Sequence, residues 1–151
     1  MIEATFAHVS LVAENWESLA DFYRRVFECE VVPPTRDLFG PELEAATNIP
    51  EAHLRGAHVR LPGRGGEGPT LEVFQYENPA PRGSLGLNAP GIAHLAFKVS
   101  DVAQAREEVI RHGGSPVGQV VTLPVAGSGR VTFAYVRDPE GNTIELQSWS
   151  D

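Results

Sequence analysis

Apolar and polar residues follow two rhythms in the first half of the chain, one typical of strands and one typical of helices. From Thr5 to Val12 they alternate one by one, which predicts a half-buried strand. From Trp16 to Phe27 apolar residues recur at helical spacing, and Asn15 stands before them as a cap, so we expect a helix. Further strands are expected at Cys29–Val32, ended by Pro33, and at Gly56–Leu61 and Thr70–Tyr76, the last two forming a hairpin. Between them, Thr35–Arg55 is expected to be irregular, apart from a short helix that starts at Pro41.

The same pattern starts again after a linker rich in proline and glycine, which covers about residues 78–90. Gly91–Val99 alternates like a strand, and Ser100 or Asp101 then caps a helix that ends at His112–Gly114. Three more strands are expected, at Val117–Leu123, Val131–Val136 and Asn142–Trp149. The prediction is therefore one α+β domain over residues 1–151, made of two βαβββ modules at about 1–77 and about 91–151.

Each predicted module carries a histidine in its first strand and a glutamate in its last strand. His8 corresponds to His94, and Glu72 corresponds to Glu145. Their apolar neighbours alternate with them, so all four polar side chains are expected on the sheet face turned away from the helices. Two imidazoles and two carboxylates that converge form a site for a divalent ion, with Zn, Ni, Co, Mn or Fe favoured over Ca or Mg. The ion itself is not specified by these ligands.

Composition and charge narrow the function classes. Lys and Arg total 12, Asp and Glu total 20, and the formal net charge is −8, which argues against nucleic acid or an anionic membrane as a partner. Cys29 is the only cysteine, so an intrachain disulfide and a cysteine-based zinc site are excluded. The chain shows neither a signal-peptide pattern at Met1–Thr5 nor a long apolar run. We expect a cytoplasmic protein.

Several segments resemble the vicinal oxygen chelate superfamily, which includes glyoxalase I, methylmalonyl-CoA epimerase, extradiol dioxygenases and bleomycin-binding proteins. The resemblance covers nearly the whole chain and rests on Phe6–Val9, Ala20–Tyr23, Gly91–Phe97 and Val136–Leu146. It implies one eight-stranded, incompletely closed, barrel-like sheet around a metal, with one divalent ion per site and His8, Glu72, His94 and Glu145 as ligands. Fold alone does not decide the reaction.

The ligand set favours some members of that superfamily over others. Extradiol dioxygenases keep two histidines and one glutamate, whereas this chain also offers Glu72, so it looks more like glyoxalase I or the epimerase. In those enzymes the metal binds a carbonyl oxygen while a carboxylate removes a neighbouring proton. We therefore expect a metal-dependent lyase or isomerase acting on a thioester, hemithioacetal or related carbonyl compound. A ring-cleaving dioxygenase and a non-catalytic protein that binds a small molecule such as an antibiotic stay open as alternatives.

Further residues are expected to complete the site. Glu72 and Glu145 are the first candidates for the catalytic base, and the resemblance to the epimerases adds Glu51, with Glu42 and Glu44 as rivals. Alternation places three aromatic side chains on the same face as these glutamates, and Arg130 is a candidate for an anionic group of the substrate. The expected pocket residues are Phe74, Tyr76, Trp149 and Arg130. Open sheet edges also predict a homodimer, with a site built within one chain or across two.

Overall fold

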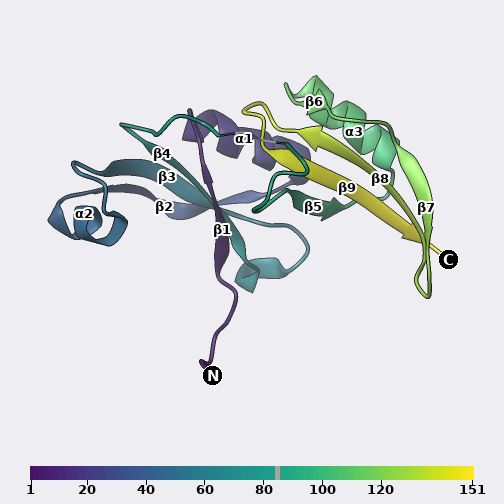
Figure 1. Ribbon diagram of the computed structural model, residues 1–151, viewed down its shortest axis with the longest axis horizontal. Coiled ribbons are helices and arrows are strands. Elements are labelled where there is room, and N and C mark those ends of the chain that lie inside the picture. The colour runs from purple at the N-terminus through teal and green to yellow at the C-terminus, as the bar shows by residue number, and fades with distance from the viewer. Residues whose placement is uncertain (84–85) are drawn as a thin grey trace. The chain divides into compact units, whose positions relative to one another are not determined.

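The computed structural model describes residues 1–83 and 86–151. Its internal contacts divide these residues into two compact units, 1–81 and 82–151. Each unit has a sheet and a long helix that packs on that sheet (Figure 1). The division falls inside the segment that the sequence predicts to be a linker.

The first unit contains a four-stranded sheet in the order β1-β4-β3-β2. Strand β1 runs parallel to β4, and the β4–β3 and β3–β2 pairs are antiparallel. Its elements are β1 (His8–Val12), α1 (Trp16–Phe27), β2 (Glu30–Phe39), α2 (Pro41–Thr47), β3 (His53–Arg60), the short 3-10 helix η1 (Gly65–Glu67) and β4 (Thr70–Tyr76).

The second unit repeats this topology. Strand β5 is parallel to the last strand, β9, which pairs antiparallel with β8. The outer position beside β8 is shared by two short strands, β6 and β7. The elements are β5 (Leu95–Lys98), α3 (Val102–Arg111), β6 (Ser115–Pro116), β7 (Val121–Val125), β8 (Gly129–Arg137) and β9 (Thr143–Ser150). The predicted α+β class and the βαβββ order of both modules are confirmed.

Both long helices begin where a side chain replaces a missing backbone partner. The carboxamide oxygen of Asn15 accepts a hydrogen bond from the Ser18 amide at 2.9 Å, and Asp101 caps α3 in the same way. Helix α3 ends at Arg111 with His112 as its C-cap, and Gly113 follows with φ +94°. These caps and the C-terminal glycine match the predictions. Together they set where each helix begins and where α3 ends.

The cores lie between each helix and the inner face of its sheet. Leu71 and Val73 in β4 have no exposed surface, and neither do Ile144 and Leu146 in β9. Each of these apolar pairs brackets a glutamate, whose side chain must point to the other face of the sheet. The same alternation therefore places the apolar side chains in the core and the glutamates on the face of the candidate site.

The predicted end of the second strand at Pro33 is wrong. Strand β2 continues through a cis Pro33–Pro34 peptide bond to Phe39, and its register against β3 shifts between Val32 and Arg36. Proline has no amide hydrogen to donate, but β2 is an edge strand, where a missing donor on the outer side costs no ladder hydrogen bond. Much of the stretch expected to be irregular is therefore strand.

Other strands differ in length from the prediction. Strand β1 starts at His8 rather than at Thr5, and β5 starts at Leu95, so His94 precedes its strand instead of lying in it. Of the strand expected at Val117–Leu123, residues 121–123 form the start of β7, and the two-residue strand β6 precedes the expected bounds. Alternation reports which face a side chain takes, whereas strand bounds depend on where a partner strand is available.

None of the helices in the described residues is both long enough and apolar enough to cross a membrane.

Gly56 is required for close packing of β3 on β4. It lies opposite Phe74, and a Cβ atom at this position would come within 2.1 Å of the Val73 carbonyl oxygen and 2.4 Å of Cδ1 of Phe74. We expect Gly56→Ala to lower the free energy of unfolding by about 1–3 kcal/mol through overpacking. Gly66→Ala is the control, because nothing lies within 4 Å of its Cβ position. Denaturant unfolding of both variants measures the difference, and equal stability would contradict this account.

Candidate functional site

Glu72 in β4 is the centre of a cluster in the first unit. Across the sheet it is in register with Ser10 of β1 and with His58 of β3. His8 lies on the same face as Ser10, since the two residues are two positions apart along β1. Three neighbouring strands therefore bring two imidazoles and one carboxylate to the same face.

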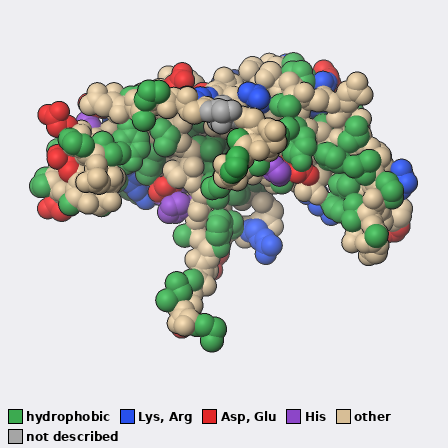
Figure 2. Space-filling model, in the orientation of Figure 1, with side chains coloured by type: hydrophobic (Ala, Val, Ile, Leu, Met, Phe, Trp, Pro, Cys, Tyr) green, Lys and Arg blue, Asp and Glu red, His purple; other side chains and the backbone are tan. Residues whose placement is uncertain are grey.

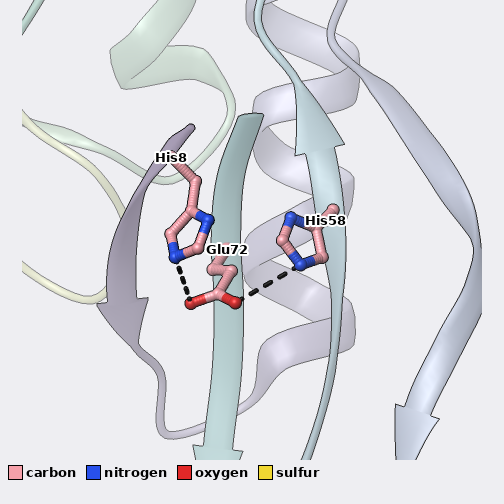
Figure 3. Close-up of side chains that lie close together, drawn as sticks. All are labelled: His8, His58 and Glu72. Atoms are coloured by element: carbon pink, nitrogen blue, oxygen red, sulfur yellow. Dashed lines mark ion pairs between the residues drawn. The ribbon is translucent and has the colours of Figure 1, made fainter. Parts of the chain in front are cut away.

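The geometry of this cluster is close and symmetric about the carboxylate. Nε2 of His8 is 3.3 Å from one oxygen of Glu72, and Nε2 of His58 is 3.3 Å from the other oxygen. Figure 3 shows the two imidazoles on either side of Glu72, both directed at its carboxylate. The two rings meet edge to face with centroids 5.4 Å apart. One ligand atom from each residue lies within 4.8 Å of the others, which is the geometry of a potential metal site.

His58 belongs to this cluster, although the four ligands predicted from the sequence do not include it. Its side chain is only 19% exposed, and Nδ1 is 2.8 Å from the hydroxyl of Thr70. Burial lowers the pKa of His58, and the nearby charges of Arg36 and His8 act in the same direction, while Glu72 opposes them. A lower pKa favours the neutral imidazole, which is the form that binds metal.

The second unit carries the other predicted pair. Nε2 of His94 is 3.0 Å from a carboxylate oxygen of Glu145. Tyr135 lies opposite Glu145 across the β8–β9 ladder and donates a hydrogen bond to it, and the rings of Tyr135 and His94 have centroids 5.4 Å apart. Burial raises the pKa of Tyr135, and the charge of Glu145 adds to the effect. In the described residues, Nδ1 of His94 is buried without a hydrogen-bond partner.

The donor atoms of both units fit a divalent ion. Neighbouring ligand atoms around an ion with bonds of about 2.1 Å are separated by roughly 3.0–3.4 Å, and the three imidazole–carboxylate distances of 3.0, 3.3 and 3.3 Å agree with this range. Imidazole with carboxylate is a donor set for transition metals or zinc. Figure 2 shows histidine and acidic side chains adjoining at the molecular surface, so groups of this kind are reachable from solvent.

Two of the predicted pocket residues, Phe74 and Tyr76, follow Glu72 along β4. The ring of Phe74 packs edge to face against the ring of His58, with centroids 6.0 Å apart. Tyr76 follows on the same face of β4 and is partly buried. Both residues are thus on the face of β4 that carries Glu72.

Trp149 and Arg130 lie at one end of the second sheet. Trp149 is 42% exposed, and its indole nitrogen donates to the side-chain oxygen of Gln147 at 2.5 Å. Arg130 is exposed near the start of β8. Glu145, Gln147 and Trp149 share one face of β9, as alternation predicts. Trp149 is thus on the same face of β9 as Glu145.

Glu51 lies in a different part of the first unit. It is exposed, has φ 54°, and lines a pocket of about 610 Å³ together with Glu44, His53 and other residues at this end of β3. Because a strand rises about 3.3 Å per residue, His53 is roughly 16 Å from His58 along β3, and Glu51 precedes His53. Glu42, the other rival, lies in the first turn of α2. In the first unit, Glu51, Glu42 and Glu44 are thus separate from the cluster around Glu72.

Comparison with known proteins matches most of the chain to one family. Residues 5–146 match the model of the Glyoxalase/Bleomycin resistance protein/Dioxygenase superfamily. The chain is 29% identical over 142 residues to lactoylglutathione lyase GLX1 of Arabidopsis thaliana, covering 93% of this chain and 43% of that protein. It is 24% identical over 140 residues to the ethylmalonyl-CoA/methylmalonyl-CoA epimerase of Cereibacter sphaeroides, covering 93% of this chain and 94% of the epimerase.

A solved structure shares the fold. A glyoxalase family protein from Bacillus cereus superimposes with a TM-score of 0.81 at 19% sequence identity, over 100% of this chain and 97% of that one. This likeness concerns the fold alone. Among the relatives, the chain spans nearly the full length of the epimerase but less than half of the plant lyase.

Glu72→Gln is expected to weaken binding of Zn²⁺ or Co²⁺ by at least about 10-fold, because the amide keeps the shape of the side chain but loses the charge that offsets the ion. Competition with a chelating dye measures the affinity. Glu77→Gln is the matched control, since Glu77 follows β4 directly but pairs with His53 and Arg55 outside the cluster. If both variants bind as tightly as the unchanged chain, Glu72 is not a ligand.

Proposed function

The chain belongs to the Glyoxalase/Bleomycin resistance protein/Dioxygenase superfamily, and on that premise we propose that it is a metal-dependent isomerase or lyase that moves a proton at a carbon next to a carbonyl group. The observation that carries this proposal is one partly buried carboxylate in each module, Glu72 and Glu145, each facing a histidine. The names of two relatives, a lyase and an epimerase, support the same reaction class.

The chemistry asks for a base and for stabilisation of negative charge. A carbon next to a carbonyl releases its proton slowly in water, so the charge that develops on the carbonyl oxygen must be stabilised where it forms. A bound divalent ion would supply that stabilisation. Glu72 or Glu145 accepts the proton, and the other carboxylate or a further acid returns it. Two such carboxylates suit both an epimerisation and a glyoxalase-type shift.

The proposed ligand set comprises His8, Glu72, His94 and Glu145, one pair from each copy of the duplicated module. The proposed substrate is a small thioester or hemithioacetal. Phe74, Tyr76 and Trp149 offer apolar contacts for its carbon chain, and Arg130 offers a positive charge for a carboxylate or phosphate. Glu51 stays a candidate second acid, with Glu42 and Glu44 as rivals.

A ring-cleaving dioxygenase is the second candidate. His8, His58 and Glu72 together are a set of two histidines and one carboxylate, which is the donor set of many non-haem iron(II) oxygenases. This observation favours the dioxygenase more than the sequence does, because His58 was not counted among the donors there. Oxygen uptake with a catechol separates it from proton transfer.

We expect incubation of the metal-loaded protein in heavy water to introduce deuterium into methylmalonyl-CoA or into the adduct of methylglyoxal with glutathione. Glu72→Gln or Glu145→Gln should slow exchange by at least about 100-fold, because loss of a general base removes that much of the rate. Mass spectrometry of the recovered substrate measures the exchange.

Control measurements distinguish proton transfer from a dioxygenase and from a protein that only binds its ligand. Glu77→Gln should exchange like the unchanged chain, because its carboxylate lies outside the cluster. If the iron(II)-loaded protein consumes oxygen with a catechol and introduces no deuterium into the thioester or the adduct, the proposed proton transfer is wrong and the dioxygenase is favoured. Tight binding of a substrate without deuterium exchange or oxygen uptake would show that the protein binds this molecule but does not convert it.

We also propose that the protein is a homodimer. β1 and β5 are regular edge strands of their sheets, and large apolar side chains such as Phe6, Phe39 and Trp149 are exposed. Strand edges and apolar surface of this kind are commonly covered by a second copy. Light scattering at micromolar concentration is expected to give twice the mass of the chain, and the mass of one chain would contradict the proposal.

A further inference from the structure

We propose that the first module is sufficient to hold the divalent ion, through His8, His58 and Glu72, and that His94 and Glu145 are not required for binding. The inference rests on the proposed function only for the presence of such an ion. It adds a residue, His58, to the proposed ligand set and gives the two carboxylates different tasks.

The three donors are already arranged about one point before any ion is bound. The two imidazoles face different oxygens of the same carboxylate, each at 3.3 Å, which is at the long end for a hydrogen bond but suits atoms that share a metal. Hydrogen-bonded ladders join β1, β4 and β3, so the spacing of these side chains is fixed by a single sheet. Little reorganisation is needed to bind.

Thr70 orients the imidazole of His58. Its hydroxyl is 2.8 Å from Nδ1, and Nε2 is the ring nitrogen that faces Glu72. With Nδ1 held by the hydroxyl, Nε2 is the nitrogen placed to bind an ion beside the carboxylate. A histidine anchored through its other nitrogen is the usual arrangement of a metal ligand.

Among the residues that the structure describes, no third donor of this kind joins His94 and Glu145 in the second module. Tyr135 takes the position opposite Glu145 that His58 takes opposite Glu72, and a neutral phenol is a much weaker ligand than imidazole. His94 precedes β5 rather than lying in its ladder, and its Nδ1 has no hydrogen-bond partner in the part of the chain that the structure describes. The second pair is therefore less well anchored.

The asymmetry assigns different roles to the two glutamates. Glu72, between two imidazoles, holds the ion. Glu145 accepts a hydrogen bond from Tyr135 and is the carboxylate available to take the substrate proton. Removal of the charge of Glu145 should then abolish proton exchange while metal binding persists, and removal of the charge of Glu72 should abolish both.

Titration of the full chain with Co²⁺ tests the inference, with affinity and the visible absorption of the bound ion as readouts. The double variant His94→Ala/Glu145→Gln should still bind Co²⁺. His58→Gln should weaken binding by at least about 10-fold and change the absorption spectrum, and Thr70→Val should weaken it in the same direction, since loss of an outer partner of a ligand costs about 10–100-fold in affinity. His53→Gln is the matched control, because His53 lies on the same strand but pairs with Asp37 and Glu77.

Each result separates this inference from the proposed function. Loss of binding in the double variant, or His58→Gln and Thr70→Val variants that fold and bind like the control, overturns the inference and leaves the proposed reaction standing. The expected binding pattern without deuterium exchange overturns the reaction and leaves the inference standing. Absence of Co²⁺ binding in the unchanged chain overturns the inference and the metal dependence together.

Discussion

The two-residue period of β4 and β9 sets the layout of both modules. Each strand sends neighbouring side chains to opposite faces, so the leucine and valine beside Glu72 enter the core while the carboxylate points away from it. A slip of one residue would bury the carboxylate and expose Leu71 and Val73. The burial of the core therefore fixes the register on which the candidate site depends, and the site needs no separate device to hold Glu72 in place.

The sequence predicts those parts of the site that depend on local pattern. Alternation and duplication are visible in the residues themselves, and they identified the His8–Glu72 and His94–Glu145 pairs, which the structure brings within 3.3 and 3.0 Å. His58 was missed because its nearness to Glu72 depends on the register between β3 and β4, which the glycine-rich turn between them does not reveal. Gly56, His58 and Arg60 alternate on one face, and that was the available signal.

The duplicated fold gives two copies of one scaffold that differ where chemistry takes place. The position opposite the central glutamate is histidine in one copy and tyrosine in the other. Such a substitution leaves the ladder and the core intact, because the side chain lies on the face away from the helix. The fold itself is compatible with several reactions, and the residues on this face are where family members with one scaffold can diverge.

Three strands at the open sides of the two sheets, β2, β6 and β7, share a feature that β1 and β5 do not have. β2 carries Pro33 and Pro34, β6 carries Pro116, and β7 carries Pro124. Each proline removes an amide hydrogen from a strand that has one open side, so a strand from another molecule finds an incomplete ladder there. These edges are poor templates for growth of intermolecular sheets. The same prolines make β2, β6 and β7 irregular, and this irregularity makes these strands hard to recognise in the sequence.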